Sequence, residues 1–263
     1  MSYETIRHQF NEGVAKITLA QPDTLNALSQ SMMRELREVL EEVSSDKSVR
    51  AVLITGEGRG FSSGANLVEA GKSQDLRNLD LGQLLEAHYH PVINAINQMP
   101  KPVIAAVNGI AAGAGMSLAI ACDIVLAARS AQFIQVFIRI GAIPDAGSTW
   151  SLPRRIGDPR ARALAMTGEP VGGEQTAEWG LAWKCVEDES LCDEAWTLAR
   201  KLAAMPTRAL GTIKQAYAAS LNNTLDEQLA LEARLQSEIG RSHDFVEGVT
   251  AFLEKRPAQF TGE

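Results

Sequence analysis

The chain has 263 residues, of which 45% are hydrophobic and 22% charged, and a formal net charge of −7. This length and apolar content suffice for one large domain or two small ones, and the composition argues against disorder. An acidic chain without a cluster of lysine or arginine is a poor candidate for binding nucleic acid, so we expect no such partner.

The N-terminus and the cysteines indicate a cytoplasmic protein. Residues 1–5 lack the apolar segment of a secretory signal, and the longest apolar stretch, residues 102–128, is interrupted by polar residues and glycines. We therefore expect no association with a membrane. Three cysteines without a CxxC pair are typical of reduced cytosolic thiols. The absence of an HExxH motif or a histidine–cysteine cluster predicts no metal site.

The first two-thirds of the chain alternate between patterns typical of strands and of helices. The helix expected over residues 29–45 begins with a serine, a favourable N-cap residue, and carries an apolar stripe at helical spacing. Turns are expected at residues 57–61 and 108–113, and a mobile loop at the polar residues 67–78. Strands are predicted over residues 14–20, 51–55, 101–107 and 124–127. Two further helices are predicted over residues 81–99 and 114–121.

The last third contains helical patterns alone. They cover residues 191–205, 207–220, 225–240 and 244–256. Strand–helix units followed by helices predict an α/β core, which we place at residues 1–200, and a helical C-terminal region at residues 201–263. A long amphipathic tail is expected to pack against another surface, for which a second subunit is the simplest choice.

The segment 108–117 (NGIAAGAGMS) follows a predicted buried strand and opens an apolar helix. The first amides of a helix have no intrahelical acceptor, and small residues let a ligand approach the backbone. The segment is therefore suited to stabilising an anion or a developing oxyanion. Close packing of the helix on the strand through small residues is an equally good explanation.

A second turn of small residues, 61–67 (FSSGANL), also follows a predicted strand. Because an oxyanion is best held by two converging N–H donors, the two turns together make such a pair feasible. The pattern alone does not establish that they converge.

Asp145 lies after an apolar run and before a predicted helix. It either stabilises the start of that helix or is a carboxyl group in apolar surroundings, where desolvation prepares it for proton transfer. His88 and His90 fall in the predicted helix over residues 81–99, where histidines are commonly surface residues.

Taken together, these segments resemble the crotonase (enoyl-CoA hydratase/isomerase) superfamily over nearly the whole chain, and most of all its isomerases of phenylacetate catabolism. The resemblance rests on segments 22–28 (PDTLNAL), 60–65 (GFSSGA), 101–109 (KPVIAAVNG), 143–147 (IPDAG) and 251–256 (AFLEKR). It implies a spiral of ββα turns with a helical trimerisation region, assembled as a homotrimer or a dimer of trimers. The implied substrate is an acyl-CoA thioester, so that coenzyme A enters with the substrate and no separate cofactor is expected.

The resemblance also assigns residues to the site. The backbone N–H groups of Ala65 and Ala114 match the family's oxyanion hole, and Asp145 matches the acid/base carboxylate of its isomerases. Four residues around the first turn match positions that contact CoA in the family: Ala27, Ser63, Ala65 and Leu67. Phe252 and Lys255, on the C-terminal segment, match positions that reach CoA bound to the same or to a neighbouring subunit.

Departures from the family pattern bear on the reaction. Its hydratases carry two glutamates, at positions that match Ser117 and Phe137 here. Neither residue can activate water as a carboxylate base, so the resemblance implies isomerisation, of 1,2-epoxyphenylacetyl-CoA to oxepin-CoA or of an enoyl-CoA double bond. Thr24 and Asn66 also depart from the usual residues, which bears on how the CoA nucleotide is bound.

Three alternatives remain open. The first is hydration of a 2-enoyl-CoA. The second is a hydrolytic aryl-CoA dehalogenase, in which Asp145 is the nucleophile and His90 its base, although Phe137 replaces the tryptophan of those enzymes. The third is a family member that has lost catalysis and serves as a binding protein.

Overall fold

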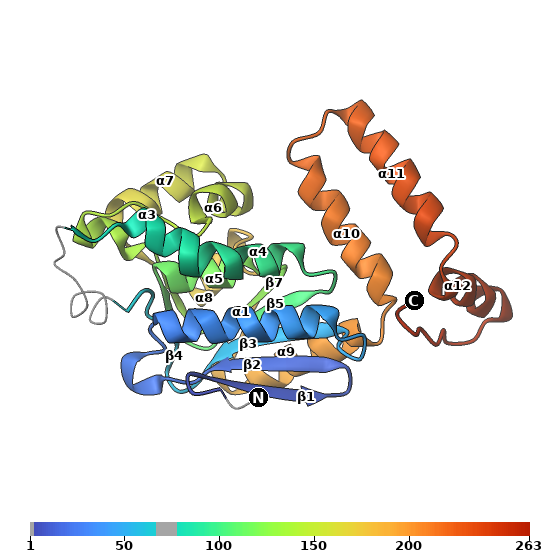
Figure 1. Ribbon diagram of the computed structural model, residues 1–263, viewed down its shortest axis with the longest axis horizontal. Coiled ribbons are helices and arrows are strands. Elements are labelled where there is room, and N and C mark those ends of the chain that lie inside the picture. Colours follow the sequence, from blue (N-terminus) through green and yellow to red (C-terminus); the bar gives the residue numbers. More distant parts are fainter. Residues whose placement is uncertain (1–2, 67–77) are drawn as a thin grey trace.

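Residues 3–66 and 78–263 of the computed structural model describe the fold, which is built on two sheets (Figure 1). The larger sheet has the strand order β1-β2-β3-β5-β7-β10, with β1 antiparallel to β2 and the other pairs parallel. Its strands are β1 (Ile6–Asn11), β2 (Val14–Leu19), β3 (Ala51–Gly56), β5 (Val103–Val107), β7 (Ile124–Ala128) and β10 (Lys184–Val186).

The smaller sheet has the strand order β4-β6-β8-β9. Its members are β4 (Gly60–Ser62), β6 (Ile110–Ala112), β8 (Gln132–Ile134) and β9 (Pro170–Gly172). Strands β3, β5 and β7 of the large sheet are each followed at once by a strand of the small sheet, and β6 is followed by a helix. This order gives the predicted spiral of ββα turns.

The helices of the core pack against the sheets and against one another. The first, α1 (Gln30–Ser45), begins as predicted, because Ser29 Oγ accepts a hydrogen bond from the Met32 N–H, and it buries a stripe that includes Leu36 and Leu40. The predicted helix over residues 81–99 is present as α3 (Leu81–Leu84), a π-helical turn (Leu85–Tyr89) and α4 (His90–Gln98). The others are α5 (Ala114–Ala121), α6 (Ser148–Ile156), α7 (Asp158–Thr167), α8 (Gly173–Glu178) and α9 (Leu191–Ala203).

The two predicted turns are corrected in part by the structure. Residues 58–59 and 113 form turns as predicted, but Gly60–Ser62, which overlaps the end of the first predicted turn, and Ile110–Ala112, within the second, are strands that pair in parallel. Strands of three residues are too short to produce a periodic pattern, so only pairing between distant segments reveals them. The predicted loop at residues 67–78 falls almost entirely outside the described residues.

The C-terminal helices extend away from the sheets (Figure 1). α10 (Thr207–Ser220) and α11 (Leu225–Ile239) pack against each other as a pair, and α12 (His243–Glu254) follows α11 and lies near the start of α10. Many of their apolar side chains are exposed, among them Tyr217, Leu225 and Phe252. Over the described residues, no helix is long and apolar enough to cross a membrane.

Candidate functional site

The first small-residue turn follows β4 and lies against the segment that leads into α1. Leu28 pairs with Ala65 in an isolated parallel bridge. The Leu28 N–H donates to Gly64 O (2.7 Å), and the Asn66 N–H donates to Leu28 O (3.2 Å). The Ala65 N–H takes no part in this bridge, and Ala65 is exposed. This amide is therefore available to a ligand.

The second turn places Ala114 at the first position of α5. Gly113 precedes it with φ of +51°, and the Gly113 N–H donates to Ile134 O (2.9 Å), which ties the turn to β8. At the first helical position the Ala114 N–H has no intrahelical acceptor, and the helix dipole adds positive potential there. The position therefore suits a donor to a negatively charged oxygen.

The two turns are in direct contact, as an oxyanion hole requires. A Cβ atom built on Gly64, whose φ is +97°, would lie 2.7 Å from Ala112 O and 3.5 Å from Ala114 N. Gly64 directly precedes Ala65, so the Ala65 and Ala114 amides belong to neighbouring backbone segments. A Cβ on Gly115 would lie 2.6 Å from Ser62 O. The small residues therefore allow the two turns to pack closely, as a pair of oxyanion donors from these turns requires.

Asp145 lies in the turn before α6. Its Oδ1 atom is buried and has no hydrogen-bond partner among the described residues. Burial raises the pKa of this carboxyl group to about 6. The interpretation of Asp145 as a helix cap is wrong, because the N-cap of α6 is Gly147 and no side chain caps that helix. A desolvated, unpaired carboxyl group is instead suited to proton transfer near neutral pH.

Ser117 and Phe137, which match the hydratase glutamates, both lie beside these groups. Ser117 Oγ is 3.0 Å from the backbone O of Asp145 and 3.3 Å from Gly113 O. A Cβ on Gly113 would lie 3.7 Å from Phe137 Cζ. Among Ser117, Phe137 and Asp145, only Asp145 carries a carboxyl group.

Buried polar residues that the sequence analysis did not select hold the first turn in place. Asn26, with φ of +54°, donates from Nδ2 to Gly60 O (2.9 Å) and to Glu57 O (3.0 Å). Ser62 Oγ donates to Asn26 O (2.8 Å). Asn26 lies in the segment 22–28 on which the resemblance rests, so its place in that motif was an available signal.

The predicted CoA-contacting residues fall into two groups. Ala27 and Ser63 adjoin the first turn, where Ser63 Oγ donates to Thr24 O (3.0 Å). Leu67 lies outside the described residues. Phe252, 82% exposed, and Lys255 lie at the end of α12, away from α5 within this chain (Figure 1). The fold of one chain therefore does not bring this second group to the first.

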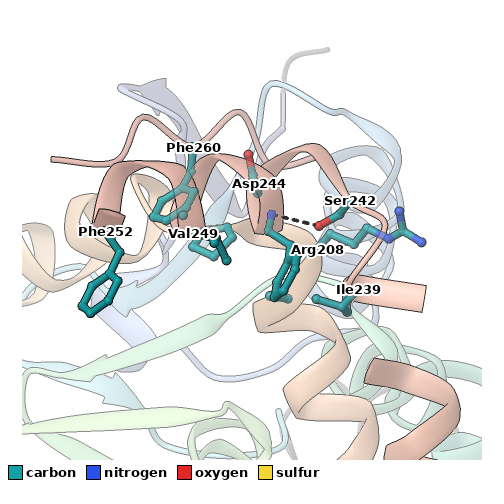
Figure 2. A pocket seen from close by; sticks show the side chains of 11 residues that line it. Arg208, Ile239, Ser242, Asp244, Val249, Phe252 and Phe260 are labelled. Carbon is teal, nitrogen blue, oxygen red and sulfur yellow. Dashed lines mark hydrogen bonds between the residues drawn. The ribbon is translucent and has the colours of Figure 1, made fainter. Parts of the chain in front are cut away.

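The end of α12 borders an apolar cavity of about 340 Å³ (Figure 2). The rings of Phe252 and Phe260 and the side chain of Val249 surround it. The C-terminal tail closes against α12, because the buried Asp244 carboxylate accepts hydrogen bonds from the Thr261 and Gly262 N–H groups, both at 2.7 Å.

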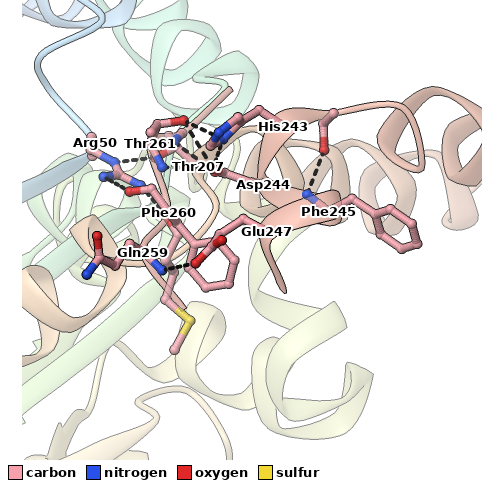
Figure 3. Close-up of polar contacts among 12 residues, drawn as sticks. Arg50, Thr207, His243, Asp244, Phe245, Glu247, Gln259, Phe260 and Thr261 are labelled. Carbon is pink, nitrogen blue, oxygen red and sulfur yellow. Dashed lines mark hydrogen bonds and ion pairs between the residues drawn. The ribbon is translucent and has the colours of Figure 1, made fainter. Parts of the chain in front are cut away.

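Arg50, immediately before β3, anchors this tail to the core (Figure 3). It donates to Phe260 O (2.9 Å), and its Nε donates to Thr207 Oγ1 (2.9 Å). The cavity and the tail are thus held in a defined position relative to the sheet.

His90 and possible metal ligands were the other candidate groups of the site. His90 is the exposed first residue of α4, and its neighbour Tyr89 donates to Leu28 O (3.0 Å) beside the first turn. In the described parts of the chain, no group of three or more His, Cys, Asp or Glu residues could hold a metal ion.

The raised pKa of Asp145 predicts how stability depends on pH. Because the folded pKa (about 6) exceeds the usual value, protonated Asp145 favours folding at low pH, and this contribution is lost as pH rises through 6. We expect Asp145→Asn to stabilise the protein at pH 8 by about 1–2 kcal/mol, after allowance for partial solvent exposure, and by much less at pH 4.5.

Urea unfolding at the two pH values measures this difference. The exposed carboxyl group of Glu169, replaced in Glu169→Gln, serves as the matched control and should change stability little at either pH. A loss of stability in Asp145→Asn at pH 8 would contradict the burial of an unpaired charge.

Two contacting turns of small residues, one of which begins a helix, and a buried carboxyl group in a turn hydrogen-bonded to that helix are features suited to stabilising an oxyanion formed from a carbonyl group. The chain belongs to the enoyl-CoA hydratase/isomerase family, whose model matches residues 9–263. It is an enzyme of that family.

Similar proteins agree with this assignment. The chain is 47% identical to 1,2-epoxyphenylacetyl-CoA isomerase of Escherichia coli over 99% of both chains. It is 48% identical to a probable enoyl-CoA hydratase of Rhodobacter capsulatus over the full length of both.

Solved structures confirm the predicted crotonase fold. A putative enoyl-CoA hydratase from Streptomyces coelicolor superposes with a TM-score of 0.92 at 36% identity, covering 100% of this chain and 96% of the other. A putative enoyl-CoA hydratase/isomerase from Mycobacterium abscessus gives 0.93 at 34% identity, covering 98% and 100%.

Proposed function

We propose that this enzyme is a CoA-thioester isomerase that converts 1,2-epoxyphenylacetyl-CoA to oxepin-CoA or moves the double bond of an enoyl-CoA. The observation that carries the proposal is the desolvated carboxyl group of Asp145, whose backbone is hydrogen-bonded to α5, the helix that begins with Ala114. The Escherichia coli relative, named for the epoxide reaction, supports the choice of substrate.

In a double-bond shift, the Asp145 carboxylate removes a proton from the carbon between the thioester carbonyl and the double bond. The electron pair of that C–H bond moves into the carbonyl, which becomes an enolate oxygen held by the Ala65 and Ala114 N–H groups. The protonated Asp145 then returns the proton to the far carbon of the conjugated system, and the carbonyl re-forms. The step consumes no water, and coenzyme A, as part of the substrate, is the one cofactor-like group required.

Rearrangement of the epoxide also conserves every atom of the substrate. It therefore needs polarisation of the thioester and at most a transferable proton, and the same residues supply both.

Hydration of a 2-enoyl-CoA is the second candidate, because the Rhodobacter relative is named a probable enoyl-CoA hydratase. Against it, Ser117 and Phe137 offer no carboxylate to activate water. A hydroxyl group bonded to main-chain carbonyls and an aromatic ring occupy those positions.

A turnover screen decides between these reactions. We expect wild-type enzyme to convert 1,2-epoxyphenylacetyl-CoA or a 3-enoyl-CoA, and Asp145→Ala to convert neither, with hydration of crotonyl-CoA slow in both. Rapid hydration of crotonyl-CoA by the wild type would overturn the proposal in favour of the hydratase. Release of halide from a 4-halobenzoyl-CoA would instead favour the dehalogenase.

We also propose that residues 201–263 form the trimerisation region of a cytoplasmic homotrimer or dimer of trimers. The exposed apolar side chains of α10–α12 support this, as does the position of α12, at whose end Phe252 and Lys255 lie, away from α5 of the same chain (Figure 1). Those two residues would then contact CoA bound to a neighbouring subunit.

A further inference from the structure

We propose that the buried hydroxyl group of Ser117 is a positioning group that sets the Asp145 carboxyl group relative to the Ala114 N–H donor. The inference rests on the proposed function, in which these two groups act on the same substrate. It assigns a role to the position where hydratases of the family carry a glutamate.

The hydroxyl group contacts both halves of the site. Ser117 Oγ is 3.0 Å from the carbonyl oxygen of Asp145 and 3.3 Å from that of Gly113. The Gly113 carbonyl also accepts the Ser117 N–H at 3.0 Å, and because it shares one planar peptide group with the Ala114 N–H, this backbone bond fixes the direction of that N–H. The single hydroxyl hydrogen of Ser117 has its shorter contact with the Asp145 carbonyl, so it joins the Asp145 turn to the helix that carries this donor. One hydroxyl group therefore links the oxyanion donor to the residue that carries the acid/base group.

The Asp145 side chain has little else to hold it. Its Oδ1 atom has no hydrogen-bond partner in the described ranges, so the backbone must define its position. That backbone is unusual, because Ala146 and Gly147 follow with φ of +47° and +79°. A non-glycine residue in this region is strained and keeps its conformation only where surrounding contacts hold it.

Two donors reach the Asp145 carbonyl. One is the Ser148 N–H at 3.0 Å, which belongs to the same turn and cannot place the turn relative to α5. The other is the Ser117 hydroxyl, which comes from α5 itself. Because the Ser148 contact remains, Ser117→Ala does not leave the Asp145 carbonyl without a partner, and the variant should fold.

Enzymatic rates are sensitive to such placement, and a displacement of about 1 Å can cost roughly 100-fold. We expect Ser117→Ala to lower kcat for isomerisation by about 10- to 100-fold with KM within about twofold of wild type. Ser117→Thr, which keeps the hydroxyl group, should restore most of the loss.

Thr176→Val is the matched control. Thr176 is fully buried in α8, and its hydroxyl group donates to Gly173 O within the same segment, so the substitution removes a comparable hydrogen bond away from the site. Its kcat should equal that of wild type.

A second measurement does not depend on turnover. The difference in unfolding free energy between the chain with Asp145 and its Asp145→Asn variant, followed against pH, reports the pKa of Asp145. The same comparison is then made between Ser117→Ala and the double variant Ser117→Ala/Asp145→Asn. We expect the pKa of Asp145 to move down from about 6 toward the ordinary value, because a loosened turn lets the carboxyl group reach water.

The outcomes separate the two proposals. If Asp145→Ala isomerises CoA thioesters no differently from the wild type, the proposed function fails. The pH titration of Asp145 would still test the positioning role of Ser117. If Ser117→Ala matches Thr176→Val in both kcat and titration, the positioning role is wrong. A lower kcat with an unchanged titration would also contradict it, because the hydroxyl group would then act on something other than the carboxyl group.

Discussion

Asp145→Asn is expected to lower kcat for isomerisation of a CoA thioester by roughly 1,000-fold, because a positioned general acid–base group contributes about 10²- to 10⁴-fold. Asparagine has nearly the shape of aspartate but cannot accept and return a proton. Its amide places no charge in the partly buried turn where the pKa of Asp145 is raised, so the fold should be retained.

Binding separates a chemical defect from a structural one. The dissociation constant of a non-reactive acyl-CoA, measured by calorimetry, should change by less than about threefold, since Asp145 provides no anchoring contact in this reaction scheme. Turnover within about tenfold of wild type would rule out Asp145 as the proton carrier. Loss of turnover together with loss of binding would point instead to a damaged site.

Ala114→Pro is expected to lower kcat by about 100- to 1,000-fold, the usual cost of losing one oxyanion-hole donor. Proline removes the N–H group and is otherwise well tolerated at the first position of a helix, which Ala114 occupies in α5. The preceding residue is Gly113, whose lack of a Cβ avoids the usual clash with a proline ring.

Leu225→Pro is the corresponding control, because Leu225 is the 73% exposed first residue of α11 and follows Thr224 in an extended conformation. Circular dichroism should detect no loss of helix in either variant, so the loss of turnover in Ala114→Pro can be assigned to the missing N–H group. Equal turnover by Ala114→Pro and wild type would remove the Ala114 amide from the mechanism.

Local patterns in the sequence predict much of this structure. The helix over residues 30–45 is predictable because Ser29 supplies a cap and the apolar residues repeat at helical spacing. The strands at residues 14–19 and 103–107 are predictable from alternation and from a continuous apolar run. Each of these signals lies within a few residues along the chain.

Contacts between distant segments escape such patterns. The three-residue strands β4 and β6 were expected as turns, because each exists only through pairing with the other and its neighbours in the small sheet. Asp145 was equally well explained as a helix cap until the position of Gly147 excluded that interpretation.

For the site, the sequence by itself determined the ingredients: two small-residue turns after buried strands, an aspartate between an apolar run and a helix, and no carboxylate at positions 117 and 137. Only the tertiary structure decided that the turn at Gly64 contacts Ala114 and that the Ser117 hydroxyl group reaches the Asp145 carbonyl. The physical reason is that amide direction, desolvation and hydrogen bonding depend on neighbours in space. Here those neighbours lie about 30 to 50 residues apart along the chain, beyond the reach of any local pattern.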